Sequence, residues 1–398
     1  MTEDLLIKNV RPLGSEACDV LIHDGSITAL GPNLAPSTPA TTVIEGGGRL
    51  IFPGFVDAHA HMDKTLLGLG WYRNEVGPTL TDKIENERRL RRERNIDAYE
   101  QSTRQARLAI AAGTTHIRTF VDIDTEVGLR GFDGVMRMRE DFRDALTIQV
   151  VAFPQSGMLI RPGTVELMET ALANGATVVG GLDPSAIDRD PAKHLDVIFN
   201  LAEKYDVDID IHLHEPGELG AFSLELIAER TKVLGWQGRV VISHALCLGG
   251  VDDAYLGQLI ELLLENDITI MSHGPSGLRP VPSVKRLREA GVPLCTGNDG
   301  IRDAWGPLNM PDMLLRAFIV AYRNNLRRDH EIEMVLDIAT HGGARVLGDR
   351  HYGLAPGKRA DLVLVDGETH VEAVIERPPR WLVLKGGQVV ARAGECVV

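Results

Sequence analysis

Cysteine is scarce in this sequence, and its placement excludes two classes of protein. The 398 residues contain four cysteines, which are Cys18, Cys247, Cys295 and Cys396. They are scattered and form no Cys-x-x-Cys pair, so the sequence predicts neither a disulfide framework nor a thiolate zinc knuckle. Few, unpaired cysteines are typical of a chain that works in a reducing compartment.

Long apolar runs and excess positive charge are also missing. No apolar stretch approaches the roughly 20 residues that cross a bilayer. The chain begins Met-Thr-Glu-Asp, which is acidic where a signal peptide would be basic. The formal net charge is −14, and a negative field opposes binding to nucleic acid or to anionic membranes. These features together predict a cytoplasmic protein without nucleic-acid or membrane partners.

The pattern of the sequence changes twice along the chain. Strand-like segments with turns between them occupy residues 1–48 and 353–398. Residues 49–352 alternate short apolar segments with helical stretches, as βα units around a parallel sheet do. We therefore predict an α/β fold, with a (β/α)8 TIM barrel over 49–352 inserted into a small β-sandwich domain formed by both termini. The length suits a barrel of about 250 residues plus such a unit.

Individual strands are marked by short apolar and β-branched runs. The expected strands of the terminal domain are Leu5–Val10, Asp19–His23, Ile27–Leu30, Asp361–Val365, Val374–Ile375, Trp381–Leu384 and Gln388–Ala391. The expected barrel strands are Leu50–Val56, His116–Val121, Ile148–Phe153, Ala176–Gly181, Asp208–His212, Val240–Ser243, Ile268–Ser272 and Val292–Cys295. Around the second barrel strand, Arg118 and Asp122 are expected to form a buried pair. The charged segment Asp82–Arg94 is interpreted as a helix with a solvated face, with a mobile cover over the barrel mouth as the alternative.

The strongest functional signal is Pro53–His61, which reads PGFVDAHAH. Successive side chains of a strand point to opposite faces, so His59 and His61 share one face about 6–7 Å apart. Two imidazoles on one face can converge on one cation. Imidazole favours zinc, iron or copper over magnesium.

Three more predicted barrel strands end in side chains of the same kind. Asp210–Glu215 reads DIHLHE, His244 follows the sixth strand, and Asp299 follows the eighth. All strand ends of a barrel rise to one face, which is the face that carries active sites. A single histidine at a strand end is usually structural, but four such ends together indicate a metal site.

The order His-x-His, His, His and Asp on strands one, five, six and eight resembles the amidohydrolase superfamily. The resemblance covers nearly the whole chain, from an opening signature at Ile51–Asp63 to the return into the β-sandwich at Gly353–Val363. Within the superfamily, the cytosine deaminase-like branch is the most similar. The segments that resemble this branch are Gly113–Thr119, Val151–Gln155 and Gly297–Asp303.

This resemblance implies a metal-dependent hydrolase and assigns roles to residues. The implied ligands of one divalent ion, Zn²⁺ or Fe²⁺, are His59, His61, His212 and Asp299. Such an ion lowers the pKa of water from about 16 towards 7, and Asp299 can take the released proton. His244 would orient the hydroxide or stabilise the charge that it passes to the substrate. Glu215 would protonate a ring nitrogen and carry a proton to the leaving amine.

Four further residues are expected to bind the substrate. Gln155 matches a residue that hydrogen-bonds the ring in cytosine deaminases, and His214, Lys64 and Trp305 lie close to the motifs in the sequence. Lys64 could instead form a structural ion pair. Trp305 could form an aromatic wall with Trp71, or could simply pack against its neighbours.

Two positions depart from bacterial cytosine deaminases of this type, and both affect the pocket rather than the metal. His214 stands where those enzymes carry an acidic residue, and Gly300 stands where they carry a second aspartate that meets the base. The resemblance therefore implies hydrolytic deamination of an amino-substituted nitrogen heterocycle of the pyrimidine, purine, pterin or triazine type, without favouring one ring.

Two alternatives stay open at this point. The enzyme could hydrolyse a cyclic amide or an N-alkyl amine substituent on such a ring, which changes only the group that leaves. The chain could also be an inactive barrel that serves as a binding module, although the intact ligand set and Glu215 argue against this. A homo-oligomer is compatible with the sequence.

The fourth predicted barrel strand bears on the number of ions. Two-metal members of the superfamily bridge their ions with a carboxylated lysine, or sometimes a carboxylate, at the end of this strand. Ala176–Pro184 contains no lysine, and Asp183 is its only candidate bridge. We therefore expect one ion, and the direction of the Asp183 side chain decides the question.

Overall fold

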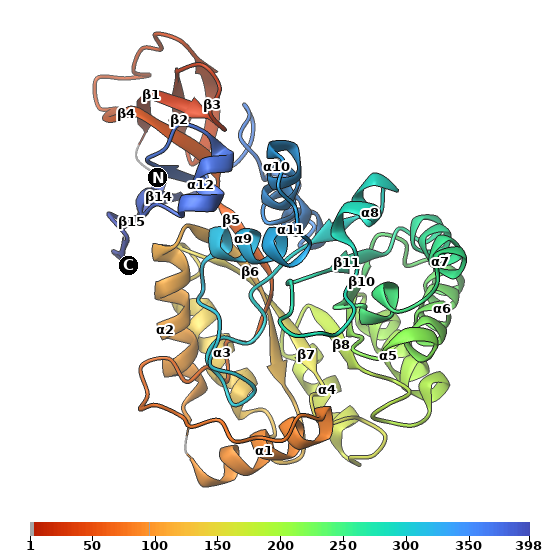
Figure 1. The fold of residues 1–398 in the computed structure, drawn as a ribbon. Helices are drawn as coiled ribbons and strands as arrows, with labels where there is room; N and C mark the ends of the chain where they lie inside the picture. The colour runs from red at the N-terminus through yellow and green to blue at the C-terminus, as the bar shows by residue number, and fades with distance from the viewer. Residues whose placement is uncertain (1–3, 95) are drawn as a thin grey trace.

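The computed structural model describes residues 4–94 and 96–398, which form a large barrel with a smaller β domain beside it (Figure 1). The predicted domain start at residue 1 and the first three residues lie outside this described part. None of the described helices is both long and apolar enough to cross a bilayer. The helices are α1 Leu80–Glu93, α2 Ala98–Ala111, α3 Arg130–Asp141, α4 Thr164–Ala173, α5 Pro191–Tyr205, α6 Gly217–Leu234, the 3-10 helix η1 Leu246–Gly249, α7 Asp253–Glu265, α8 Val284–Glu289, α9 Met313–Arg323, α10 Asp329–Ile338, α11 His341–Val346 and α12 His370–Glu376.

Eight parallel strands, hydrogen-bonded in the order of the sequence, form the barrel. They are β5 Phe55–Ala60, β6 Thr114–Asp122, β7 Thr147–Phe153, β8 Val178–Leu182, β9 Asp208–His212, β10 Val240–Ser243, β11 Thr269–Met271 and β12 Leu294–Cys295. The ring closes because the segment after β12 pairs with β5: the Asp299 N–H donates to the His59 carbonyl at 2.7 Å. The predicted (β/α)8 barrel is confirmed.

Arg118 and Asp122 both lie on β6, but the pair predicted between them is wrong. Arg118 is fully buried and donates to Asp210 at 3.1 Å. Asp122 instead pairs with Lys64 at 3.2 Å and with Arg91 at 2.7 Å. Four residues along a strand span about 13 Å, so the two side chains reach opposite ends of the barrel interior.

Strands from both ends of the chain form the second sheet, in the order β16-β15-β14-β13-β4-β1-β2-β3. They are β1 Leu5–Pro12, β2 Cys18–His23, β3 Ser26–Gly31, β4 Thr42–Pro53, β13 Leu362–Val365, β14 Arg380–Lys385, β15 Gln388–Arg392 and β16 Glu395–Cys396. The sheet folds over its own apolar core, which both termini supply. At the turns, a Cβ on Gly25 would lie only 2.8 Å from the Gly386 carbonyl oxygen, so the two hairpins touch. The predicted β domain built from both termini is confirmed.

The run Leu50–Val56, predicted as the first barrel strand, is divided between the two sheets. Residues up to Pro53 belong to β4 of the small domain, and β5 begins at Phe55. The joint is Gly54, where an added Cβ would lie 2.2 Å from the Thr115 hydroxyl oxygen. A continuous apolar run carries no signal for a change of sheet, so the glycine was the only marker.

The prediction of a strand at Val374–Ile375 is wrong, because this segment lies in helix α12. Thr369 and Glu372 form a capping box at the start of this helix. A Thr-x-x-Glu spacing before an apolar pair is a helix-start signal. This helix-start signal was present in the sequence, and it outweighs the strand preference of two consecutive β-branched residues.

Candidate metal centre and active site

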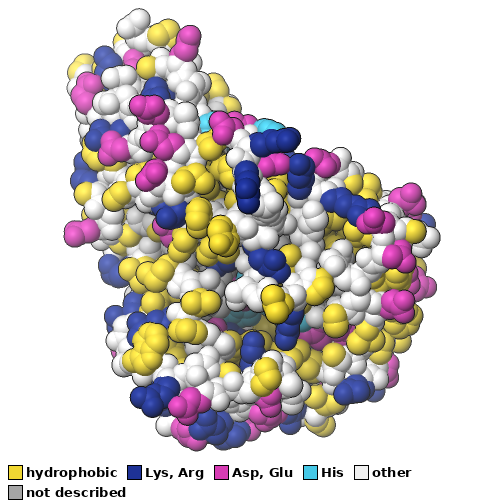
Figure 2. Space-filling view, viewed as in Figure 1, with side chains coloured by type: hydrophobic (Ala, Val, Ile, Leu, Met, Phe, Trp, Pro, Cys, Tyr) yellow, Lys and Arg dark blue, Asp and Glu magenta, His cyan; other side chains and the backbone are white. Residues whose placement is uncertain are grey.

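Four buried or half-buried side chains meet at the carboxyl end of the barrel. His59 from β5, His212 from β9, His244 after β10 and Asp299 after β12 each offer one ligand atom, and these atoms lie within 4.8 Å of one another. On this side of the barrel, Figure 2 shows a hollow with histidine side chains visible inside it and Lys and Arg side chains at its rim. The fold therefore brings these four strand ends together, as the sequence predicts.

The His59 ring is held in one orientation by a short chain of polar groups. Its Nδ1 lies 3.0 Å from the Ser243 hydroxyl oxygen, and Ser243 donates to Asp210 at 2.7 Å. Because the Ser243 hydroxyl donates its hydrogen to Asp210, its oxygen accepts a hydrogen bond from the His59 Nδ1–H. The His59 Nε2 lone pair is then free, and this buried nitrogen has no hydrogen-bond partner among the described residues.

His61 joins the same centre through its Nε2 atom. This nitrogen lies 3.3 Å from Asp299 Oδ1 and 3.4 Å from His212 Nε2. Ligand atoms about 2.0–2.1 Å from one tetrahedral ion would be separated by roughly 3.3–3.4 Å. The spacing therefore matches adjacent corners of a metal site.

The chemistry of the donor set fits a divalent cation. Burial lowers the pKa of His61 to about 4 and holds that of His212 well below its ordinary value, so both rings are neutral and can offer lone pairs. The buried nitrogens His59 Nε2 and His244 Nε2 lack protein partners within the described chain. Neutral imidazoles with one carboxylate are the ligands that Zn²⁺ and Fe²⁺ accept.

The position of Asp299 is fixed by a strained backbone conformation and by hydrogen bonds from its neighbour to β5. Its φ is 62°, which is in the left-handed region that non-glycine residues rarely adopt. The neighbouring Asn298 donates its backbone N–H to Asp57 at 2.9 Å and its side-chain amide to the same carboxylate at 2.7 Å. A buried carboxylate of β5 thus holds the loop that carries Asp299.

His244 faces the centre from β10, with φ of 72°. Its Nδ1 lies 3.0 Å from His273 Nδ1, and His273 Nε2 lies 3.5 Å from Asp299 Oδ2. The ring of His214 stacks on that of His244 with 4.4 Å between centroids. His244 is therefore enclosed by imidazoles, with its Nε2 left for the centre.

Glu215 lies beside the cluster, just before α6, and its carboxylate is held by hydrogen bonds. Oε1 accepts hydrogen bonds from the backbone N–H groups of Ser185 and Ala186, each at 2.7 Å. The Ser223 hydroxyl donates to Oε2. Burial raises the pKa of Glu215 above its ordinary value, which favours the protonated form that a proton donor needs.

Asp183, the candidate bridge between two ions, points to the end of β9. Oδ1 accepts from the backbone N–H groups of His214 at 2.6 Å and Glu215 at 3.1 Å. Oδ2 lies 2.8 Å from His214 Nδ1. Both oxygens are therefore occupied by donors of the protein.

Lys64 lies in a buried ion network rather than free in the pocket. Its Nζ donates to Gln155 Oε1 at 2.9 Å, and it lies 3.2 Å from Asp122 and 3.4 Å from Glu87. Three acceptor side chains thus surround the three N–H groups of the Lys64 ammonium. Because Gln155 accepts through Oε1, its amide NH₂ group is left to donate to a ligand.

Trp305 is half-buried and is fixed at both of its N–H groups. The indole Nε1–H donates to Glu87 at 2.6 Å, and the backbone N–H donates to Asp303 at 2.8 Å. Trp71 is 70% exposed, with the Arg302 guanidinium 5.4 Å from its ring centroid. An aromatic wall made of both tryptophans stays a prediction.

Helix α1 lies against the residues that follow β5 and β6. Glu87 contacts Lys64, and Arg88 pairs with Asp124 at 2.8 Å; both α1 residues are buried. The interpretation of Asp82–Arg94 as a solvated helix face is therefore right only for its outer residues. Whether this cover moves stays a prediction.

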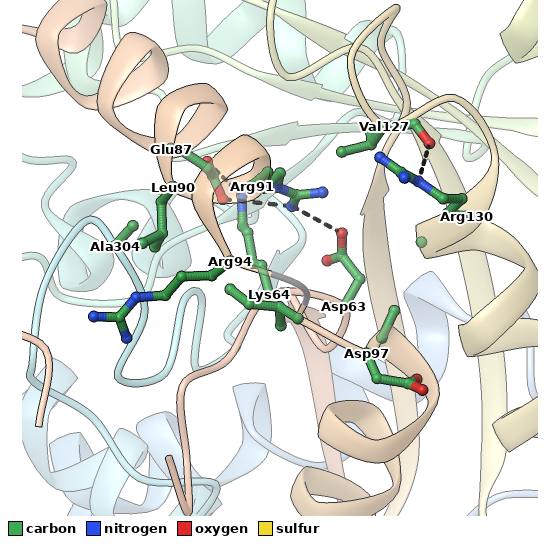
Figure 3. Close-up of a pocket in the computed structure, with 13 residues that line it drawn as sticks. Asp63, Lys64, Glu87, Leu90, Arg91, Arg94, Asp97, Val127, Arg130 and Ala304 are labelled. Atoms are coloured by element: carbon green, nitrogen blue, oxygen red, sulfur yellow. Dashed lines mark hydrogen bonds and ion pairs between the residues drawn. The ribbon is translucent and has the colours of Figure 1, made fainter. Parts of the chain in front are cut away.

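The network also borders a cavity of about 270 Å³ (Figure 3). Arg91 lies between Glu87 and Asp63 in this view, at 3.2 Å from Asp63. Arg94 and Arg130 line the cavity, but none of the cluster histidines does. The cavity is therefore separate from the metal centre.

Several residues that shape the centre were not singled out from the sequence. Asp210 had a usable signal, because it precedes His212 by two positions and so shares its face of β9. Ser243 directly precedes His244, but a serine in a strand is uninformative alone. Glu87 and Ser223 come from distant helices, and no local pattern announces them.

The comparisons with known proteins agree with this geometry. The sequence matches the amidohydrolase family over residues 42–391. The structure of N-isopropylammelide isopropylaminohydrolase from Burkholderia multivorans is 49% identical, with a TM-score of 0.96 over 99% of this chain and 100% of that chain. N-isopropylammelide isopropyl amidohydrolase from Pseudomonas sp. (strain ADP) is 34% identical, over 88% of each chain. The structure of 5-methylcytosine deaminase from Klebsiella pneumoniae with 5-fluorocytosine is 28% identical, with a TM-score of 0.87 over 97% of each chain. The chain therefore belongs to the amidohydrolase family, and it is a metal-dependent hydrolase of C–N bonds.

Proposed function

We propose that this enzyme hydrolyses an exocyclic C–N bond of an oxo-substituted nitrogen heterocycle and releases the amine. The observation that carries the proposal is the centre itself: four strand ends place three imidazole groups and a carboxylate around one point, with buried nitrogens that have no partner among the described residues. The implied ligands are His59, His61, His212 and Asp299. The same geometry argues against an inactive binding module, because a scaffold has no use for buried imidazole lone pairs without a partner.

A bound divalent ion would supply hydroxide at neutral pH, since it lowers the pKa of water from about 16 towards 7. Asp299 is placed to accept the proton. His244 presents Nε2 to the centre and stabilises the charge that develops when the C–O bond forms. Glu215 gives a proton to a ring nitrogen and then to the leaving amine, so one water is consumed for each C–N bond broken.

The pocket beside the centre offers groups for a polar, planar ring. Lys64 donates to the Gln155 oxygen, and no acceptor for the Gln155 amide NH₂ is found among residues 4–94 and 96–398, so this group can donate to a ring carbonyl. His214 is half-buried; its ring Nδ1 is engaged by Asp183, and no hydrogen bond of its Nε2 is found in the described part of the chain. Lys64 contributes by orienting Gln155, and Trp305 provides an apolar face.

An N-alkylamino triazine is the first candidate substrate, and an alkylamine is the first candidate leaving group. Relatives at 49% and 34% identity are named for N-isopropylammelide, whereas the relative named for 5-methylcytosine is 28% identical. Gly300 and His214 also depart from the cytosine deaminase pattern. Deamination of an amino-substituted ring stays the second candidate, because only the leaving group differs.

We propose one ion per chain, Zn²⁺ or Fe²⁺. A second dication would need an anionic bridge, since two ions about 3.5–4 Å apart repel strongly. Asp183 is the only carboxylate at the end of β8, and both its oxygens accept hydrogen bonds from protein donors.

The test is product analysis on a matched panel. Purified metal-loaded enzyme is given N-isopropylammelide, ammelide, cytosine and pterin, and isopropylamine and ammonia are quantified against a chelator-treated control. We expect isopropylamine from N-isopropylammelide with a kcat/KM at least about tenfold above ammonia release from ammelide, because a pocket rarely discriminates less between substituents of this size. Ammonia release alone would favour the second candidate. Release of neither amine from any ring would overturn the proposal.

A further inference from the structure

The space beside Gly300 is filled by another residue's carboxylate. A Cβ added to Gly300 would lie 2.0 Å from Asp303 Oδ2, which is far closer than atoms can approach. A side chain at position 300 and the present position of Asp303 therefore exclude one another. Gly300 directly follows Asp299, so this carboxylate stands next to the metal centre.

The two oxygens of Asp303 have different surroundings. Oδ1 accepts from the backbone N–H groups of Trp305 at 2.8 Å and Gly306 at 3.1 Å, and these bonds hold the loop. Oδ2 takes part in no hydrogen bond found within residues 4–94 and 96–398. The side chain is 6% exposed, and Asp299, Lys64 and Glu87 all act on its charge. Oδ2 is thus an acceptor without a partner in the described chain, and Asp303 lies close enough to Asp299, Lys64 and Glu87 for their charges to act on it.

We propose that Asp303 is a substrate-binding residue, and that its Oδ2 accepts a hydrogen bond from a ring N–H of the heterocycle. This inference rests on the proposed function and extends it to the part of the ring that is recognised. A glycine at 300 opens the space, and a carboxylate from three residues further along the loop fills it. The carboxylate that the cytosine deaminase pattern carries at position 300 is therefore supplied here from position 303.

The chemistry selects rings in the lactam form. An oxo-substituted triazine or pyrimidine carries an N–H beside a carbonyl, so the N–H can donate to Asp303 while the carbonyl accepts from Gln155. Burial raises the pKa of Asp303 to about 6, so near neutral pH the group is largely an acceptor. An aromatic ring without such an N–H would leave a buried carboxylate unpaired, which is the strongest form of discrimination available to a polar pocket.

Two single variants separate substrate binding from support of the loop. Asp303→Asn keeps an oxygen for Trp305 and Gly306 but removes the negative charge. Gly300→Ala leaves Asp303 intact and pushes Oδ2 away. We expect each to raise the KM of the accepted ring, and the Kd of its product cyanuric acid measured by calorimetry, about 10–100-fold, as loss of a charge-assisted hydrogen bond does. The kcat should fall by less than about threefold, because the metal ligands are untouched.

A double variant and a control complete the test. Gly300→Asp combined with Asp303→Ala returns a carboxylate to the same space and should recover most of the cyanuric acid affinity. Asp144→Asn, at an exposed position, should change nothing. Wild-type affinity in both Asp303→Asn and Gly300→Ala would overturn the inference, and so would failure of the wild type to bind cyanuric acid. If the wild type binds the ring and the variants bind it weakly while no amine is released, the proposed function fails and the inference stands.

Discussion

Two histidines of the centre, His59 and His244, have a second polar group behind the ring that fixes its orientation. His59 has Ser243 and Asp210 behind its Nδ1, and His244 has His273 behind its own. Such groups set which nitrogen keeps the lone pair, and their loss typically costs about 10–100-fold in metal affinity. The residues behind the ligands therefore offer a test that leaves the ligands in place.

Ser243→Ala should weaken metal binding about 10–100-fold, because His59 Nδ1 loses its acceptor and the ring is freed to turn. Competition with a chromophoric chelator measures this affinity. Ser272→Ala is the matched control, since this buried serine lies at the end of the next strand and its hydroxyl has no partner in the described chain. Equal affinity in both variants would contradict the role assigned to Ser243.

Glu215→Gln should keep fold and metal content but lower kcat by about 10²–10⁴-fold, the usual contribution of a general acid–base group. The amide still accepts from Ser185 and Ala186, so the local structure is retained. Stopped-flow or steady-state turnover of the accepted ring gives kcat. Glu218→Gln, an exposed change in the first turn of α6 three residues further on, should be silent. A near-normal kcat in Glu215→Gln would move the proton-transfer role to His214.

Residue identities at the centre were readable from the sequence, but their orientations were not. The barrel rule places strand ends together, so His59, His212 and Asp299 could be grouped without a structure. The direction of Asp183 depends on the position of β9 relative to β8, and Lys64 is engaged by Glu87 of a distant helix. Contacts between such separate segments follow from packing, which no local pattern encodes.

Among the elements, the contact between β5 and the segment after β12 determines the geometry of the site. This contact closes the barrel and brings Asp299 to His59 in the same step. It requires a very close backbone approach at Gly297, where a Cβ would lie 2.4 Å from the His59 nitrogen and 2.6 Å from its carbonyl oxygen. One methyl group at this position cannot be accommodated without moving the strand that carries His59.

Gly297→Ala should therefore lower metal content per chain and abolish most activity, and it should destabilise the fold by about 1–3 kcal/mol as overpacking does. Metal analysis and chemical denaturation give the two quantities. Gly257→Ala in helix α7 is the control, because its added methyl meets nothing within 4 Å. That control should be neutral or stabilising by up to about 1 kcal/mol. Full metal content in Gly297→Ala would show that the strands tolerate separation here.

Element types were predicted well in the barrel and less well at the domain boundary. The strands β9 and β10 have the predicted bounds, because a buried strand between two helices has clear limits. At Gly54 the chain passes from one sheet to another without leaving the extended conformation. Hydrophobic periodicity reports burial, not the sheet that provides it, so periodicity alone did not show this boundary.

At the scale of the whole molecule, a buried ionic cluster joins the small domain to the base of the barrel. His116 on β6 lies 3.0 Å from Asp349, and Lys385 on β14 lies 3.0 Å from Asp361. The Arg359 side chain reaches both His116 and Asp349. His116, Asp349 and Asp361 have the spacing of metal ligands. The cations Lys385 and Arg359, however, already neutralise the two carboxylates. The exact limits of the two domains and any homo-oligomer stay predictions.

This cluster predicts acid sensitivity of the assembled molecule. Its hydrogen bonds to His116 and Arg359 hold the pKa of Asp349 below its ordinary value. A carboxylate with a lowered folded pKa stabilises the protein above its unfolded pKa of about 4, and this stability is lost as the pH falls through the folded value. Asp349→Asn should thus lower the free energy of unfolding by about 1–3 kcal/mol at pH 7.

The difference between wild type and Asp349→Asn should shrink steadily below about pH 4, because Asp349 of the unfolded wild type takes up a proton there while the folded carboxylate stays ionised. Urea unfolding between pH 3 and 7 gives the curve. Asp366→Asn, at a salt bridge with a 71% exposed carboxylate, should stay within about 0.5 kcal/mol of wild type at every pH. A difference that is independent of pH would refute the linkage.

The central claim is that one metal ion, held by the strand ends of the barrel, makes C–N hydrolysis possible. The most direct measurement is titration of metal-free enzyme with Zn²⁺ or Fe²⁺ while amine release from the accepted ring is followed. Turnover should be absent at the start and should rise linearly to saturation at one equivalent per chain, because His59, His61, His212 and Asp299 complete one site and leave a position open for water. Saturation at two equivalents, or turnover that persists after verified metal removal, would contradict the account.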